Sequence, residues 1–467
     1  MPILQRVFFF LTSRSILRHT AIMDDSHRII VIGAGAAGLM AAGRAAELGA
    51  SVILLEKMER PGKKILVSGN GRCNLTNCRD RDSFIAQFGP NGLFLGNAFN
   101  RFFRDDLMAF LRRYGIECKV KSAGKVYPVT ENARDIVRVF QRYIDDGRVT
   151  LQLGVKVTGI LVENGRVSGV STPAGDLPVS AVILAAGGSS HPQTGSTGDG
   201  FCLAAELGHN IVRLRPGLVP LITTNVEQTK IWQGANLRNI RITAFRCSSD
   251  KIDPSLIPPQ DIGRGIDGRF PEYPIIESRT GDADIVHFGL SGPVILEMSL
   301  AIVDALENGP VSLSIDLLPD KDFAALQAEL LSSFDMISCL TFQNYLKDFL
   351  PMKLVDRLIS MISVSPDRLG DRLSLGEVEC LLKMLKSLRF DIKSAYSMST
   401  AMVTAGGIDL KEIDPLTMAS RLVEGLYFCG EILDLDAGTG GYNLQAAFST
   451  GYVAGESAAS FVKGNTC

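Results

Sequence analysis

Three glycines and one glutamate near the N-terminus have the spacing of a nucleotide-binding turn. A short β-branched run ends in Gly33, and Gly35 and Gly38 complete the pattern G-x-G-x-x-G at the start of an Ala-rich helix. A second apolar run leads to Glu56, 18 residues after Gly38. Gly33 permits a tight turn, Gly35 lets the backbone approach a pyrophosphate, and Gly38 lets the helix pack on the strand. This order predicts dinucleotide binding; a glycine-rich turn without a ligand is the alternative.

The backbone and the acid of this turn have separate predicted roles. The helix N-terminus presents free N–H groups to phosphate, and Glu56 can bind both hydroxyls of an adenosine ribose. The residues of the turn that we assign to the cofactor are Gly33, Ala34, Gly35, Ala36, Ala37 and Gly38.

A second glycine-rich segment, residues 61–77, follows the acid. Its glycines let the backbone approach a ligand, its cations can neutralise phosphate, and its Ser and Asn side chains add hydrogen-bond partners. Asn70 stands where a third glycine is more usual, and Asn tolerates positive φ better than most residues. From Lys57 onward we assign to the cofactor Lys57, Lys64, Ser68, Gly69, Asn70, Gly71, Arg72, Cys73 and Asn74.

Near the C-terminus an apolar strand ends in Gly430-Glu431, and a glycine turn at 438–443 opens another Ala-rich helix. A helix N-terminus favours negative charge, including that on the N1/C2 side of a reduced flavin, and Glu431 can reach ribityl hydroxyls. Three contact zones along the chain suit one extended FAD molecule better than NAD. The residues assigned here are Gly430, Glu431, Gly440, Gly441, Tyr442, Asn443 and Leu444.

Several stretches in order along the chain carry a resemblance to one family. They are residues 31–38, 63–77, 184–190, 287–293, 403–408 and 425–455. On these motifs the sequence resembles the YhiN/BaiN-like (aminoacetone-oxidase-like) FAD-dependent oxidoreductases of the glutathione reductase/fumarate reductase flavoprotein superfamily. The resemblance implies an α/β fold, with a Rossmann-type FAD-binding domain interrupted by a β-barrel-like insert and a small helical subdomain. It also implies that Val157 contacts adenine through its backbone.

Patterning along the chain agrees with that organisation. The continuous apolar run 181–186 is typical of a buried parallel strand, and we assign Ala186, Gly187 and Gly188 at its end to the cofactor site. A β-meander is predicted from 149–153, 155–161 and 166–172. Helices are predicted at 98–114, 131–145, 322–334, 342–362 and 375–388. The predicted units are an N-terminal extension (1–23), the first segment of the FAD-binding domain (24–210), a β-rich insert (211–320), a helical subdomain (321–393) and the second segment of the FAD-binding domain (394–467).

Composition excludes several classes of function. The chain has 467 residues, a net charge of −2 and no long basic run, and we read the arginine-containing segment 101–113 as a solvated amphipathic face. We therefore expect a small-molecule substrate, no nucleic acid partner and no membrane partner. The oligomeric state stays open. Nine scattered cysteines suit free thiols in a reducing cytoplasm, and no metal-ligand spacing appears.

The first 22 residues carry three arginines and no acid before Met23. They are not predicted to form part of the fold. An upstream start codon, with Met23 as the working start, is the favoured explanation, and a signal or transit peptide is the alternative.

Two side chains are candidates for catalysis. His287, after an apolar run and before a glycine, can act as general acid or base, or can be a hydrogen-bonded structural histidine. Cys73 is predicted to lie beside the flavin. His191 can touch the cofactor, and Tyr127 either lines the flavin face or packs before the following proline.

The predicted reaction is hydride transfer between an unidentified organic substrate and flavin N5, with NAD(P)H or O2 serving the other half-reaction. One alternative is a flavin-dependent disulfide reductase that uses Cys73 and Cys78. Against it, the sequence has no second dinucleotide motif and no His-x-x-x-x-Glu pair near the C-terminus. Another alternative is a flavin-dependent RNA-modifying enzyme, against which the neutral charge argues.

Overall fold

The computed structural model describes residues 28–253, 261–262, 274–336, 341–347, 350, 352–362, 365 and 374–464. The predicted N-terminal extension lies outside the described residues, as does most of a proline-rich stretch near residues 254–274.

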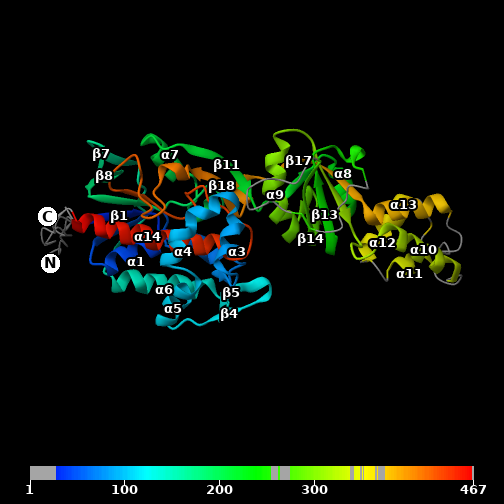
Figure 1. The fold of residues 1–467 in the computed structure, drawn as a ribbon, viewed down its shortest axis with the longest axis horizontal. Coiled ribbons are helices and arrows are strands. Elements are labelled where there is room, and N and C mark those ends of the chain that lie inside the picture. Colours follow the sequence, from blue (N-terminus) through cyan, green and yellow to red (C-terminus); the bar gives the residue numbers. More distant parts are fainter. Residues whose placement is uncertain are drawn as a thin grey trace, which may run out of the picture.

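A five-stranded parallel sheet, in the order β19-β10-β1-β2-β6, forms the centre of the largest domain of the molecule (Figure 1). Its strands are β1 (Arg28–Ile32), β2 (Ser51–Glu56), β6 (Thr150–Leu153), β10 (Ala181–Leu184) and β19 (Leu426–Phe428). β10 is buried along its whole length, as its apolar run predicts. The carboxyl ends of these strands share one edge, where open parallel sheets bind ligands.

The first and last helices of this domain pack together although they are far apart in sequence. They are α1 (Ala36–Glu47) and α14 (Tyr442–Gly464). A Cβ at Gly451 or Gly455 of α14 would collide with carbonyl oxygens of α1, so both positions need glycine. The two ends of the chain therefore complete a single domain.

Shorter elements surround the sheet. The remaining helices here are α2 (Lys63–Val67), α3 (Arg81–Ile85), α4 (Gly96–Arg101), α5 (Arg104–Arg113), α6 (Ala133–Asp146) and α7 (Asp199–Glu206). The small sheets contain β3 (Thr76–Asn77), β4 (Cys118–Val120) and β5 (Lys125–Pro128); β7 (Gly159–Glu163), β8 (Arg166–Thr172) and β9 (Gly175–Pro178); and β11 (Ile211–Gly217) with β18 (Val403–Ile408).

The predicted meander is partly wrong. Its first strand corresponds to β6, which pairs in parallel with β2 and completes the main sheet. The meander consists instead of β7, β8 and β9. The sequence pattern marks strands but not their partners, and a strand such as β6, with its exposed and half-buried residues, fits an edge position equally well.

The insert is a closed antiparallel barrel in the order β12-β15-β14-β13-β16-β17. Its elements are β12 (Leu221–Thr223), α8 (Val226–Trp232), β13 (Asn236–Phe245), β14 (Ile275–Val286), β15 (Gly289–Ser291), α9 (Pro293–Leu306), β16 (Val311–Asp316) and β17 (Leu388–Ala395). α9 lies on the side of the barrel that faces the parallel-sheet domain (Figure 1).

Four helices extend from the far side of the barrel (Figure 1). They are α10 (Phe323–Met336), α11 (Phe342–Leu346), α12 (Met352–Ile362) and α13 (Leu375–Lys386). Their buried leucines share one apolar core with the barrel. The fold class predicted from the sequence, a Rossmann-type α/β domain with a barrel insert, is confirmed; the domain boundaries stay predictions. Within the described ranges, no helix combines the length and apolarity needed to cross a membrane.

Candidate functional site

A cavity of about 810 Å³ lies at the carboxyl edge of the parallel sheet. Loops that follow β1, β2, β10 and β19 form one side of its wall. Residues of α2, β5 and α14 also line it, together with residues of β14, β15 and α9 and the segment before β18, so the barrel contributes to the same cavity. This volume is in the range of cofactor and substrate sites.

The turn after β1 is shaped to bring the backbone to a ligand. Gly33 has φ of +102°, and a Cβ there would lie 2.6 Å from Ala185 O. A Cβ at Gly38 would collide with Gly33 O. A Cβ at Gly35 would meet no atom of the described residues within 4 Å, and α1 starts without a side-chain cap in this region of the structure. Its first N–H groups are therefore available to a phosphate.

Glu56 holds this turn and faces the cavity. Its Oε2 accepts a hydrogen bond from Ala34 N at 2.8 Å, and its Oε1 accepts one from Met58 N at 2.8 Å. Each carboxylate oxygen has a second acceptor position. The acid can therefore fix the turn and still bind ribose hydroxyls.

The second glycine-rich segment and the C-terminal turn meet in the cavity wall. Buried Asn77 donates from Nδ2 to Gly440 O at 3.2 Å. A Cβ at Gly441, where φ is +93°, would lie 2.5 Å from Thr76 O. Asn70 has φ of +56°, as its predicted tolerance requires. Segments more than 350 residues apart thus form one surface beside the N-terminus of α14.

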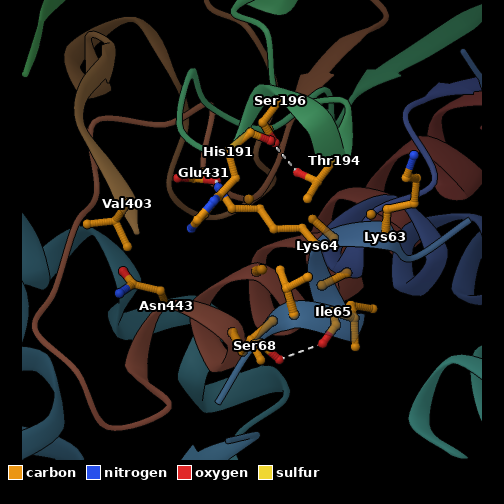
Figure 2. A pocket seen from close by; sticks show the side chains of 18 of the residues that line it. Lys63, Lys64, Ile65, Ser68, His191, Thr194, Ser196, Val403, Glu431 and Asn443 are labelled. Atoms are coloured by element: carbon orange, nitrogen blue, oxygen red, sulfur yellow. Dashed lines mark hydrogen bonds and ion pairs between the residues drawn. The ribbon is translucent and has the colours of Figure 1, made fainter. Parts of the chain in front are cut away.

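A polar cluster lies farther along the wall, where Lys64, Glu431 and His191 converge (Figure 2). Lys64 Nζ forms an ion pair with Glu431 and donates to Ser190 Oγ at 2.7 Å. Glu431 Oε1 also accepts from Ser190 Oγ at 3.0 Å and from Thr404 N at 3.0 Å. These bonds tie the ends of β10 and β19 to α2 and the start of β18.

His191 is held in an unusual backbone conformation, with φ of +52°. Burial, and then the nearby Lys64 ammonium, lower the pKa of its imidazole. The ring is therefore neutral at pH 7 and faces the cavity as a hydrogen-bonding group.

Most residues predicted to bind the cofactor lie in the cavity wall. These are Gly33, Ala34, Gly35, Ala36, Ala37, Glu56, Lys57, Lys64, Ser68, Gly69, Asn70, Arg72, Asn74, Val157, Ala186, Gly187, Gly430, Glu431, Gly440, Gly441, Asn443 and Leu444. The predicted residues that the structure does not place in the wall are Gly38, Gly71, Cys73, Gly188 and Tyr442.

The structure does not bring the two catalytic candidates into the wall. His287 is exposed in the turn between β14 and β15, whereas Ser291 and Pro293 of the same stretch line the cavity. Cys73 is fully buried, and desolvation raises the pKa of its thiol to about 12, which disfavours the thiolate needed for disulfide exchange. Cys73 and Cys78 are both free thiols. Both catalytic assignments stay predictions.

The sequence did not identify the barrel-side wall. Leu218, Leu296, Met402 and Val403 supply an apolar surface there. Thr439 Oγ1, in the turn before α14, donates to Glu297 Oε1 of α9 at 2.8 Å and so ties this wall to the parallel-sheet domain. The motifs at 287–293 and 403–408 marked two of these segments, but nothing in their spacing showed which side chains face the cavity.

The glycine turn, the acid and the two converging loops are the features of a flavin-binding Rossmann domain. The chain matches the HI0933-like protein Rossmann domain over residues 27–457. It belongs to this family. The family resemblance predicted from the motifs is confirmed, and with it the assignment of this HI0933-like protein to the FAD-dependent oxidoreductases.

The proteins that are similar to this chain are named for different reactions. The chain is 30% identical over 438 residues to a 3-dehydro-bile acid delta(4,6)-reductase of Clostridium scindens, which covers 93% of this chain and 99% of that one. It is 29% identical over 428 residues to a ribosomal RNA dihydrouridine synthase of Escherichia coli, covering 91% and 96%. A 3-ketosteroid delta1-dehydrogenase from Sterolibacterium denitrificans has a TM-score of 0.45 at 14% identity, covering 93% and 100%.

The expectation that no nucleic acid is involved is wrong. Besides the Escherichia coli protein, a ribosomal RNA dihydrouridine synthase of Haemophilus influenzae is 28% identical over 435 residues, covering 92% of this chain and 98% of that one. The near-neutral net charge misled the prediction, because charge summed over a whole chain hides a local excess of one sign.

The fit of FAD to this cavity rests on the wall itself. Its backbone is open at Gly35, an acid lies at the end of β2, and two long helices, α1 and α14, start at its edge. An adenosine ribose can use the acid, a pyrophosphate can use the open backbone and the N-terminus of α1, and a flavin ring can use the N-terminus of α14. The residues present therefore fit the cofactor.

Proposed function

We propose that this protein is a flavin-dependent reductase of a carbon–carbon double bond conjugated to a carbonyl group, with NAD(P)H as the source of electrons. When bound, FAD supplies a hydride from N5. The observation that carries the proposal is one cavity with two kinds of wall. The turn after β1 suits phosphates, and the surface around Leu296 and Met402 suits an uncharged, flat substrate.

The protein's own groups bind and orient. Glu56 would hold the ribose, and the N-terminus of α1 would hold the pyrophosphate. Lys64 and Glu431 would position the middle of the cofactor. The N-terminus of α14 would stabilise negative charge on the ring, and α9 would help to exclude water from the reacting end.

The names of the relatives support the type of bond. A delta(4,6)-reductase and a dihydrouridine synthase both add two hydrogens across a C=C bond that is conjugated with a carbonyl. The substrates are otherwise unlike, one a steroid and one a base in RNA. The shared chemistry is therefore a better guide to this chain than either substrate.

A pyrimidine in RNA is a second candidate substrate, and a local charge excess favours it. Residues 72–150 contain 14 Lys and Arg against 9 Asp and Glu, whereas the whole chain has 48 against 50. Arg72 and Lys125 of this segment lie in the cavity wall. Cations beside a site for a flat group are the combination that RNA binding uses.

Anaerobic half-reactions test the proposal. NADH or NADPH should bleach the bound flavin, and 4-androstene-3,17-dione, cyclohex-2-enone or an unmodified ribosomal RNA transcript should restore its yellow colour with formation of one saturated product. The RNA arm should weaken steeply with added salt, and the steroid arm should not. A reduced flavin that none of the three re-oxidises would overturn the proposal.

A further inference from the structure

Tyr127, in β5, is a nearly buried residue in the cavity wall whose hydroxyl lacks a protein partner. The residue is 6% exposed, and it is the one tyrosine in the wall that the described residues form. Within the stretches of the chain that the structure covers, its hydroxyl forms no hydrogen bond with another protein group. The hydroxyl oxygen is not among the buried side-chain atoms that lack a partner, so it is open to the surroundings of a residue that lines the cavity. The hydroxyl is therefore available to a ligand there.

Two cations lie beside this ring. The guanidinium carbon of Arg72 is 5.4 Å from the ring centroid, and Lys121 Nζ is 5.5 Å from it. Glu131 anchors both, at 3.8 Å from Arg72 and 2.7 Å from Lys121, and also pairs with Lys119 at 2.6 Å. Bonds to Lys119 and Lys121 lower the pKa of Glu131 to about 2. Three cations on one carboxylate leave net positive charge near the phenol.

The glycine-rich segment also packs against the ring through its backbone. A Cβ at Gly69 would lie 3.3 Å from Tyr127 Cε1, which is tight contact, and 2.8 Å from Asn74 N. Gly69 and Asn74 are themselves in the cavity wall. The phenol is thus held beside the residues that we assign to the cofactor.

We propose that the Tyr127 hydroxyl is the acid that protonates the substrate during double-bond reduction, an inference that rests on the proposed function. A hydride, which would carry two electrons from reduced FAD, forms a C–H bond at the β carbon of the substrate. The C=C π bond breaks in the same step. The hydroxyl proton forms the C–H bond at the α carbon. FAD is left oxidised for NAD(P)H to reduce again, and the phenolate recovers its proton from water.

Two groups of the polar cluster in the wall, Lys64 and His191, are less suited to this role. Lys64 is committed to Glu431 and Ser190, and the imidazole of His191 is neutral and flanked by that ammonium. Arg72 and Lys121 lie beside the ring itself.

The test is Tyr127→Phe with Tyr396→Phe as control, because Tyr396 is exposed on the barrel and outside the wall. Each purified, FAD-loaded protein is reduced anaerobically by NADPH and then mixed with 4-androstene-3,17-dione, cyclohex-2-enone or the RNA transcript. Tyr127→Phe should slow re-oxidation by about 10²–10⁴-fold, leave reduction by NADPH unchanged, and keep the Kd of the oxidised protein for the same probe within about threefold. The control should match the parent.

Tyr127→His separates acid catalysis from packing, because it restores a proton donor in place of the phenol. Re-oxidation by the probe should be faster than in Tyr127→Phe. Equal re-oxidation rates in the parent and Tyr127→Phe would overturn the role of Tyr127 but not the proposed function. Re-oxidation in Tyr127→His that is no faster than in Tyr127→Phe, with the FAD content lowered in both variants, would assign the side chain to packing. A parent that no probe re-oxidises would instead overturn the proposed function, and with it this inference.

Discussion

The two ends of the cavity are built in different ways. At the end that we propose holds the nucleotide, one turn of backbone and one carboxylate within residues 33–56 face the cavity. At the barrel-side end, Leu296 of α9, Met402 and Val403 around the start of β18, and Thr439 in the turn before α14 meet. The first end depends on glycine spacing, and the second depends on how distant segments pack. Substitutions should therefore abolish cofactor binding at one end and alter turnover at the other.

The largest effect is expected for Gly38→Ala, because the added methyl would collide with Gly33 O. We expect lost FAD binding and a free energy of unfolding lower by about 1–3 kcal/mol, measured by FAD content and urea unfolding. Gly376→Ala in α13 is the control, since a Cβ there meets nothing within 4 Å among described atoms. It should stabilise by up to about 1 kcal/mol. Normal FAD content in Gly38→Ala would contradict the assignment.

Glu56→Gln should have the next largest effect. The amide keeps one acceptor but replaces the other oxygen with a donor, so it conflicts with Ala34 N or Met58 N. The Kd for FAD should rise about fivefold, since one such bond contributes about 1 kcal/mol. Glu59→Gln, exposed and three residues away, should leave that Kd unchanged in the same titration. Equal Kd values for both variants would remove the ribose role.

Lys64 and Glu431 provide a test of the polar cluster at the middle of the cavity. Lys64→Gln, Glu431→Gln and the double variant form a cycle whose coupling free energy should be about 1 kcal/mol, because the pair is partly buried and shares Ser190. Urea unfolding of the four proteins gives the value. Additive changes in the free energy of unfolding would show that Lys64 and Glu431 do not stabilise the fold through their ion pair.

The sequence predicted the two ends of the cavity to different extents. The glycine turn, Glu56 and the buried strand β10 could be predicted because each depends on local spacing and apolar runs. The barrel-side wall could not, because whether Ser291 or His287 faces the cavity depends on the turn between β14 and β15 and on where the barrel docks. The sequence marks Tyr127 as a possible flavin neighbour, but its place in the cavity wall depends on the three-dimensional packing.

The smallest effect concerns pH at His191. Its pKa is lowered in the folded protein, so the unfolded chain binds the proton more readily. The free energy of unfolding is therefore unaffected by this group above the pKa of the unfolded chain. It decreases as pH falls through the lower pKa of the folded protein. Acidification from pH 7.5 to 5 should therefore lower the melting temperature slightly more in the parent than in His191→Asn. The corresponding difference in the free energy of unfolding should stay below about 1 kcal/mol, because the ring is partly exposed. Asn tolerates the positive φ found here.

An experimental structure of the protein with bound FAD tests the central claim most directly. We predict the adenosine ribose beside Glu56, the pyrophosphate at the N-terminus of α1, and the flavin ring at the end of the cavity lined by Tyr127 and Asn443. A ring beside Glu56, or FAD bound outside this cavity, would contradict that prediction.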